Sequence, residues 1–283
     1  MASSEPLNLC SNHIDSLKSY LPNHNKSEEA KRNDGKTSLP HVTLTYAASL
    51  DSTIAAIAVA PKTTTTTLIS GYETKAMTHY LRAVHSAILV GSNTAITDDP
   101  RLTSRWIGAV DKATNPLEYQ PRPVILDPSG RWLAGLTGNE KLLRLAHDGD
   151  GHAPWVITDT NVTIELKTLT CLQSTGGKWL KVSLGYEGRS KGVDWNVVLS
   201  ELMCLGIQSV MVEGGATVIN DLLRKKNRRY LSSIIVTIAP IFLGAGGVIV
   251  SPHREDISDN TVYNLREIKW IQMGKDVVMA ALS

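Results

Sequence analysis

Cysteine is scarce in this chain of 283 residues, and Cys10, Cys171 and Cys204 lie far apart without a CxxC pair. Such spacing excludes a disulfide framework and a cysteine-based structural zinc site. The sequence also lacks the motifs of α/β-hydrolase elbows, P-loops, HExxH metalloproteases, EF-hands and zinc-dependent deaminases. We therefore predict no metal site. Any catalytic activity must depend on residues outside these motifs.

An excess of one charge is also absent, because 29 Lys and Arg stand against 27 Asp and Glu, for a net charge of +2. Bulk charge therefore predicts neither a nucleic-acid partner nor a membrane partner. The most apolar stretch, residues 231–250, is broken by Pro240 and three glycines, which excludes a membrane-spanning helix. The start, MASSEPLNLC, has neither a basic region nor an apolar run. We expect a soluble cytoplasmic protein.

The first 40 residues have few apolar side chains after residue 22 and contain five acids and five bases. Such a composition cannot offset the entropy of ordering, and it predicts a mobile N-terminal arm over residues 1–40. Ile14, Leu17 and Leu21 have helical spacing, so a short helix against the body is an alternative to a frayed arm. Residues 41–283 are expected to form one domain.

From residue 41 the pattern alternates between strands and helices, which predicts an α/β fold. A capping box at Ser70–Glu73 predicts the start of one helix, and Asp194 and Gly206 bound another. Strands are predicted at 41–47, 87–91, 124–127, 156–158, 180–184, 207–212 and 234–239, a third helix at 216–225, and a terminal hairpin at 268–273 and 277–282.

Two segments that follow strands carry candidate ligand groups. In α/β sheets, ligands bind beyond the carboxyl ends of the strands. After the strand at 87–91, Thr94 and Asp98 offer polar groups, and Arg101 and Arg105 offer charges for a phosphate. An Asx-turn with two solvated arginines explains this spacing equally well.

The second segment is Glu213-Gly214-Gly215-Ala216-Thr217. Its paired glycines would let backbone N–H groups approach a pyrophosphate closely. An ordinary turn between a strand and a helix is the alternative, and a GG pair by itself is a weak motif. His79 and His85 are interpreted as wall or surface residues of their helix, not as a catalytic pair.

Taken in order, these motifs resemble a known family. They are HYLRA at 79–83, AILVG at 87–91, DDPRLTSR at 98–105, EGGAT at 213–217 and IAPIFLG at 238–244, with Asp127 between the third and fourth. The chain is similar over residues 41–282 to the reductases of riboflavin biosynthesis, in the monofunctional form found in fungi. These enzymes reduce 2,5-diamino-6-ribosylamino-4(3H)-pyrimidinone 5′-phosphate.

The resemblance implies a dihydrofolate-reductase-like central sheet flanked by helices, a homodimer, NADPH as cofactor, and hydride transfer to C1′ of an open-chain imine. It also implies site residues. The cofactor would contact Thr94, Asp98, Gly214, Gly215, Ala216 and Thr217, and the substrate would contact Asp51, Arg82, Leu102, Arg105 and Glu213. No catalytic side chain is assigned, because the cofactor carries the reaction and the protein aligns two rings.

The chain departs from the family pattern at Thr53, where a cation is usual, and at Ser86, where an Asp is usual. Two alternatives stay open. A pterin or folate reductase would share the fold, although a pterin has no phosphate for Arg82 and Arg105 to bind. The other alternative is a nucleotide-binding module that catalyses no reaction, and the departure at Thr53 is the only observation in its favour.

Overall fold

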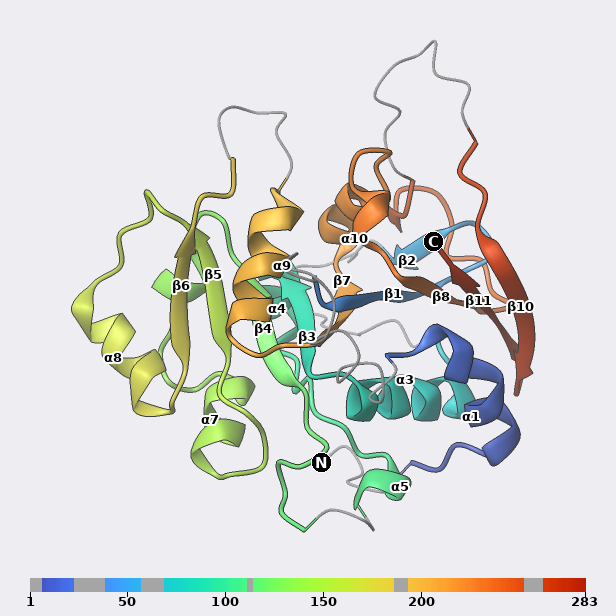
Figure 1. Cartoon of the computed structure of the whole chain (residues 1–283), viewed down its shortest axis with the longest axis horizontal. Coiled ribbons are helices and arrows are strands. Elements are labelled where there is room, and N and C mark those ends of the chain that lie inside the picture. The colour runs from blue at the N-terminus through green and yellow to red at the C-terminus, as the bar shows by residue number, and fades with distance from the viewer. Residues whose placement is uncertain (1–6, 23–38, 57–68, 111–113, 186–192, 252–261) are drawn as a thin grey trace, which may run out of the picture.

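The computed structural model describes residues 7–22, 39–56, 69–110, 114–185, 193–251 and 262–283. Within them, a nine-stranded sheet has the order β10-β11-β8-β1-β7-β3-β4-β5-β6 (Figure 1). Strands β1 and β3 to β8 run parallel, and β11 is antiparallel to both β8 and β10. The strands are β1 (His41–Ala48), β3 (Ala87–Gly91), β4 (Arg122–Leu126), β5 (Trp155–Asp159), β6 (Lys178–Val182), β7 (Ser209–Gly214), β8 (Ser233–Ile238), β10 (Arg266–Met273) and β11 (Asp276–Leu282), while β2 (Thr53–Ala55) pairs with β9 (Val248–Ile249) in a second sheet.

Helices cover both faces of the large sheet (Figure 1). Side chains alternate between the faces of a strand, so Leu89 packs under α9 and α10 whereas Ile88 packs on the opposite side. The helices are α1 (Ser11–Leu17), α3 (Tyr72–Val84), α4 (Ser92–Asp98), α5 (Ile107–Val110), α6 (Arg131–Ala134), α7 (Lys141–His147), α8 (Leu166–Ser174), α9 (Trp195–Cys204) and α10 (Ala216–Leu222), with 3₁₀ turns η1 (Lys18–Tyr20) and η2 (Arg228–Tyr230). None of these helices combines the length and apolarity that crossing a bilayer requires.

The predicted alternation of strands and helices is confirmed. The Asp194 carboxylate accepts the backbone N–H groups of Asn196 and Val197 at the start of α9, and Gly206 follows the helix with φ of 88°. These local signals work because each needs only residues close in sequence.

The predicted capping box at Ser70–Glu73 is wrong, because these side chains do not cap the start of α3. The helix begins at Tyr72 after Gly71, without a cap from Ser70. The backbone N–H of Gly71, just before the helix, instead has its acceptor near the C-terminus of the chain. The Asp276 carboxylate accepts the Gly71 N–H at 2.7 Å and the Thr74 hydroxyl at 2.6 Å. A tertiary contact with the terminal hairpin thus replaces the local motif.

The expected N-terminal arm also needs a correction. Residues 7–22 pack on the body, and their five buried side chains are Leu7, Leu9, Leu17, Tyr20 and Leu21. The short helix, offered as the alternative to fraying, is therefore present as α1. The remaining arm residues, 1–6 and 23–38, lie outside the described residues, and the division into arm and reductase domain stays a prediction.

Candidate active site

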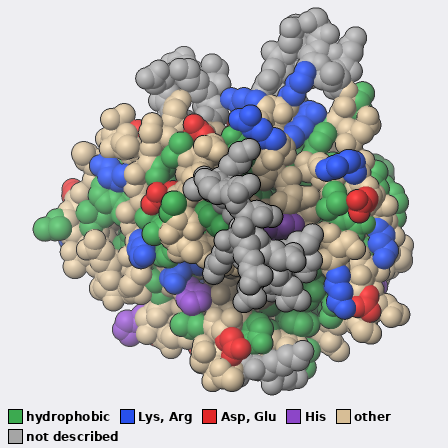
Figure 2. Space-filling model, in the orientation of Figure 1, with side chains coloured by type: hydrophobic (Ala, Val, Ile, Leu, Met, Phe, Trp, Pro, Cys, Tyr) green, Lys and Arg blue, Asp and Glu red, His purple; other side chains and the backbone are tan. Residues whose placement is uncertain are grey.

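A cavity of about 1160 Å³ lies along the carboxyl ends of β1, β3, β4 and β7. This is the edge at which parallel sheets bind ligands. Helices α3, α4 and α10 and the turn after β4 complete its walls. In the view of Figure 2, the Lys and Arg side chains of the described residues lie in separate groups.

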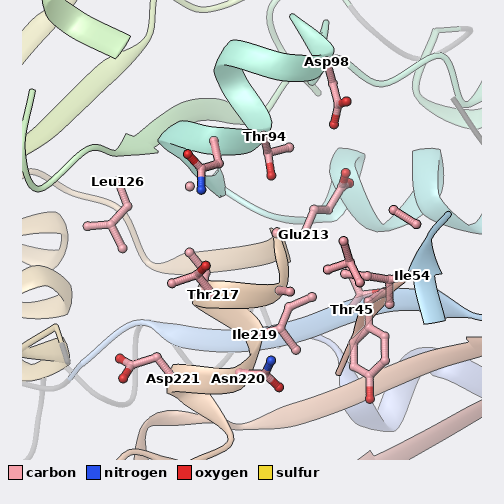
Figure 3. Close-up of a pocket in the computed structure, with 18 of the residues that line it drawn as sticks. Thr45, Ile54, Thr94, Asp98, Leu126, Glu213, Thr217, Ile219, Asn220 and Asp221 are labelled. Atoms are coloured by element: carbon pink, nitrogen blue, oxygen red, sulfur yellow. The ribbon is translucent and has the colours of Figure 1, made fainter. Parts of the chain in front are cut away.

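Seven of the eleven predicted site residues line this cavity: Arg82, Thr94, Asp98, Glu213, Gly215, Ala216 and Thr217. Figure 3 shows Thr94 and Asp98 projecting from α4 toward Glu213 of β7 and Thr217 of α10. Burial raises the pKa of the Asp98 carboxyl, and Lys141 opposes that shift. The structure thus brings together two segments separated by more than 100 residues in the sequence.

A bulge directs Glu213 into the cavity. Leu89 of β3 pairs with Val212, but the next residue, Val90, pairs with Gly214, so Glu213 is the extra residue on β7. Bulges of this kind change the direction of a side chain at the end of a strand. Gly214, at φ of 97°, takes a backbone conformation that a side chain would strain.

The two glycines after Glu213 have different surroundings. A Cβ on Gly214 would lie 2.6 Å from Cδ1 of Ile219, a buried residue of α10. A Cβ on Gly215 would lie 2.7 Å from the Thr94 hydroxyl oxygen, which faces the cavity. Gly214 therefore permits the packing of α10, whereas Gly215 leaves room beside a cavity wall.

Glu213 and Arg82 form a two-pronged ion pair. The Nε and Nη2 groups of Arg82 each donate to one Glu213 oxygen at 2.7 Å, and its Nη1 donates to the Thr103 carbonyl at 3.0 Å. Both side chains are mostly buried, at 15% and 18% exposed. The fork of the guanidinium matches the carboxylate and fixes its orientation. Arg82 thus meets a carboxylate here, where the resemblance implied a substrate contact.

Behind this pair lies a histidine that sequence reasoning set aside. His79 is 7% exposed and lines the cavity. Its Nδ1 accepts the backbone N–H of Arg105 at 3.0 Å, so the proton of the neutral ring sits on Nε2. Burial, with Arg82, Arg105 and Lys75 nearby, lowers the pKa of His79 to about 2. The ring is a neutral donor among positive charges.

Lys75, which also lines the cavity, was likewise missed. The signal was available, because Lys75, His79 and Arg82 recur at positions i, i+4 and i+7 of one helix. This spacing places all three on one helical face, opposite the apolar residues Met77 and Leu81. A polar stripe on an otherwise core-facing helix indicates a site.

Three predicted substrate residues lie outside the cavity wall. Leu102 is 2% exposed and packs in the core beside Ile88. Arg105 lies behind His79, with Nη2 at 3.5 Å from its Nε2. Asp51 accepts N–H groups from Leu243 and Gly244 and the Ser49 hydroxyl. These bonds lower the pKa of Asp51, with the Ser49 hydroxyl contributing most.

The two departures from the family pattern have structural partners. Thr53 is 1% exposed in β2, and its hydroxyl donates to the Asp51 carbonyl at 3.3 Å. The Ser86 hydroxyl lies 3.2 Å from the Ser209 hydroxyl, which joins the start of β3 to β7. Both side chains thus have hydrogen-bond partners within the fold.

The far end of the cavity is basic. Arg131 follows β4 and donates to the Asn93 side-chain oxygen at 2.6 Å. The buried Asp127 carboxylate fixes that turn by accepting the Arg131 N–H at 3.0 Å. Arg224 also lines this end, beside Asp221, and the other Asp221 oxygen accepts the Trp195 indole N–H at 2.8 Å.

Comparisons with known proteins show the family of this chain. A family model described as the RibD C-terminal domain matches residues 40–279. The chain belongs to the RibD C-terminal domain family. It is 40% identical to the 2,5-diamino-6-ribosylamino-4(3H)-pyrimidinone 5′-phosphate reductase of Debaryomyces hansenii, over 86% of this chain and 89% of the relative.

Solved structures of the RibD C-terminal domain family share the fold. The riboflavin biosynthesis reductase Rib7 of Saccharomyces cerevisiae is 30% identical, with a TM-score of 0.69 over 96% of this chain and 99% of that one. RibD of Acinetobacter baumannii matches with a TM-score of 0.62 at 22% identity, over 86% of this chain and 58% of its own. The predicted dihydrofolate-reductase-like fold and the predicted family are confirmed, and the chain is an oxidoreductase.

Proposed function

We propose that this protein reduces 2,5-diamino-6-ribosylamino-4(3H)-pyrimidinone 5′-phosphate at the expense of NADPH. The name of the Debaryomyces relative supports the substrate. The observation that carries the proposal is one cavity that brings the carboxylate of Glu213, fixed by Arg82, together with the cations of Lys75, Arg131 and Arg224. A phosphorylated pyrimidine and a dinucleotide need cations for their phosphates and an acceptor for the amines of the ring.

The residues present fit a nicotinamide dinucleotide. Gly215 leaves space beside Thr94 that a Cβ would fill, so backbone can approach a pyrophosphate. At the far end, Arg131 is available to the 2′-phosphate that distinguishes NADPH from NADH, and the Asp221 carboxylate is already engaged. When bound, NADPH supplies the hydride.

The opposite end suits the substrate phosphate. Lys75 and His79 line this end of the cavity, and the Arg105 guanidinium lies 3.5 Å from His79 Nε2. Glu213, between the two ends, is placed to accept from an exocyclic amine of the pyrimidine. Arg82 is then a positioning residue, since all three of its donor nitrogens bind protein groups.

Hydride transfer from NADPH to C1′ of an open-chain imine requires alignment and exclusion of water. The protein would supply both alignment and exclusion of water from two sides of the cavity. One side is the polar face of α3, and the other is Glu213 at the bulge of β7. Asp98, whose pKa is raised by burial, is the cavity carboxyl best suited to deliver a proton. A homodimer and a cytoplasmic location remain predictions from the resemblance.

Purified protein, the pyrimidine phosphate and NADPH test the proposal. Loss of nicotinamide absorbance, together with a ribitylamino product identified by mass spectrometry, is the expected result. Glu213→Gln serves as the matched control, because it keeps the shape of the side chain and removes the charge. If the wild-type protein binds NADPH but oxidises none with this substrate, the proposed reaction is wrong.

A further inference from the structure

Residues 7–22, here called the N-terminal segment, lie outside the part of the chain that the family model matches, 40–279. Their apolar side chains are nevertheless part of a buried cluster that includes α3. Figure 1 shows α1 beside α3 and next to β10. The Tyr20 hydroxyl donates to the Glu267 carbonyl at 2.6 Å and anchors the segment to that strand.

Leu7 binds the backbone of the loop over residues 101–106, here called the Arg105 loop. The Leu7 N–H donates to the Arg105 carbonyl at 2.8 Å, and the Ile107 N–H donates to the Leu7 carbonyl at 2.9 Å. Leu7 and Trp106 thereby form a parallel bridge. One residue of the N-terminal segment therefore spans both sides of Trp106.

Helix α3 holds the same loop from the other side. The Arg105 N–H donates to His79 Nδ1 at 3.0 Å, and the Ser104 hydroxyl donates to the His79 carbonyl at 2.6 Å. The backbone of Arg105 is thus bound in both directions, by its N–H to α3 and by its carbonyl to Leu7. A shift of Leu7 would be passed directly to Arg105.

The segment also supports α3 from behind. Leu17, Tyr20 and Leu21 belong to the cluster that contains the apolar face of α3, including Met77 and Leu81. The opposite face of this helix presents Lys75, His79 and Arg82 to the cavity. Packing on one face therefore sets the position of the donors on the other.

We propose that the N-terminal segment is a positioning element of the substrate half of the active site, acting through Leu7 on the Arg105 loop and through its apolar side chains on α3. The inference rests on the proposed function, because it assigns the Arg105 loop and α3 to the substrate phosphate. Among the described residues, the segment makes no hydrogen bond with Arg131 or Thr217, at the cofactor end.

Leu7→Pro tests the contact in the full-length chain, because proline lacks the N–H that binds the Arg105 carbonyl. Leu7→Ala is the first control, since it removes the same buried side chain and keeps the N–H. Asn8→Pro is the second, because Asn8 is exposed and makes no hydrogen bond with any described residue. The readouts are KM for the pyrimidine phosphate, KM for NADPH, and kcat.

We expect Leu7→Pro to raise KM for the pyrimidine phosphate roughly fivefold above Leu7→Ala, the equivalent of one backbone hydrogen bond. KM for NADPH should stay at the wild-type value, and Asn8→Pro should resemble the wild type in all three constants. Equal KM values for Leu7→Pro and Leu7→Ala, or a parallel rise in both KM values, would overturn the proposal.

Amide hydrogen exchange provides a readout that needs no turnover. The Ile107 amide, which donates to Leu7, should exchange faster in Leu7→Pro than in Leu7→Ala or Asn8→Pro. If the wild type shows no turnover, the proposed function fails and the substrate role of the segment fails with it, while the exchange rates still decide whether Leu7 holds the loop. Unchanged exchange at Ile107 in Leu7→Pro would refute the contact itself.

Discussion

Alanine at Gly214 and alanine at Gly215 should have opposite consequences, although the two positions are adjacent. Both have positive φ, 97° and 55°, so each substitution strains the backbone by about 1–2 kcal/mol. The difference lies in what the new methyl group meets. At Gly214 it lies 2.6 Å from the buried Ile219, whereas at Gly215 it lies 2.7 Å from the Thr94 hydroxyl oxygen in the cavity wall.

The overlap at Gly214 is with two atoms of Ile219, a side chain that is only 1% exposed, so Ile219 or α10 must shift. Overpacking of this kind adds about 1–3 kcal/mol to the backbone strain. We expect Gly214→Ala to lower the free energy of unfolding by about 2–5 kcal/mol, with KM for NADPH changing little in the protein that remains folded. Sequence reasoning had assigned Gly214 to cofactor binding, and its contact with Ile219 explains the different expectation.

Gly215→Ala should lower the free energy of unfolding by about 1–2 kcal/mol from backbone strain, with little added by the 2.7 Å overlap if the end of the Thr94 side chain moves aside. KM for NADPH should rise about tenfold or more, since one methyl group closes the approach to the pyrophosphate. Thermal unfolding gives the first quantity and steady-state kinetics gives the second. KM for the pyrimidine phosphate is the internal control and should not move. The reasoning is refuted if Gly214→Ala melts like the wild type but loses NADPH, or if Gly215→Ala unfolds without a change in KM.

Further predictions concern the charged groups. Arg82→Lys cannot form the two-pronged pair with Glu213 and should lower kcat/KM about tenfold or more, measured by NADPH oxidation, whereas a near wild-type value would contradict a positioning role. Arg131→Ala should raise KM for NADPH and leave KM for NADH unchanged, and equal effects on both would place the 2′-phosphate elsewhere. The folded-state pKa of His79, about 2, lies below the ordinary 6.5, so the unfolded chain binds a proton that the folded one does not, and stability falls as pH drops below 6.5. His79→Gln should remove up to about 1.4 kcal/mol of that loss per pH unit, as urea titrations at pH 7 and pH 5 would show. The pKa of Asp51 is lowered, so its contribution is present above the ordinary carboxyl pKa and lost in acid, and Asp51→Asn should flatten the unfolding profile below about pH 4.

Features that depend only on residues close together in the sequence could be predicted from it. The cap at Asp194, the end of its helix at Gly206 and the alternating strands need no distant partner. The ordered motifs were sufficient for the family and for seven of the residues that line the cavity. The capping of α3 could not be predicted, because its acceptor is Asp276, 205 residues away from Gly71.

Roles within the site were harder to assign than membership of it. Arg82 looked like a free cation in sequence, and only the fold brings Glu213 to 2.7 Å from it. His79, interpreted from the sequence as a wall or surface residue, lines the cavity, and only the fold shows that its Nδ1 accepts the Arg105 backbone N–H. Whether a charged group is available to a ligand depends on its partners, and these come from elements distant in sequence.

The near absence of net charge and the scarcity of cysteine predict neither a polyanion-binding surface nor a disulfide framework. Periodicity and local caps determined the α/β order, because hydrophobic spacing and turn chemistry act over a few residues. Tertiary structure alone decided that the N-terminal segment packs on α3 and that Gly214 and Gly215 have different neighbours. It also decided which cations face the cavity, because burial and pairing are properties of the folded chain.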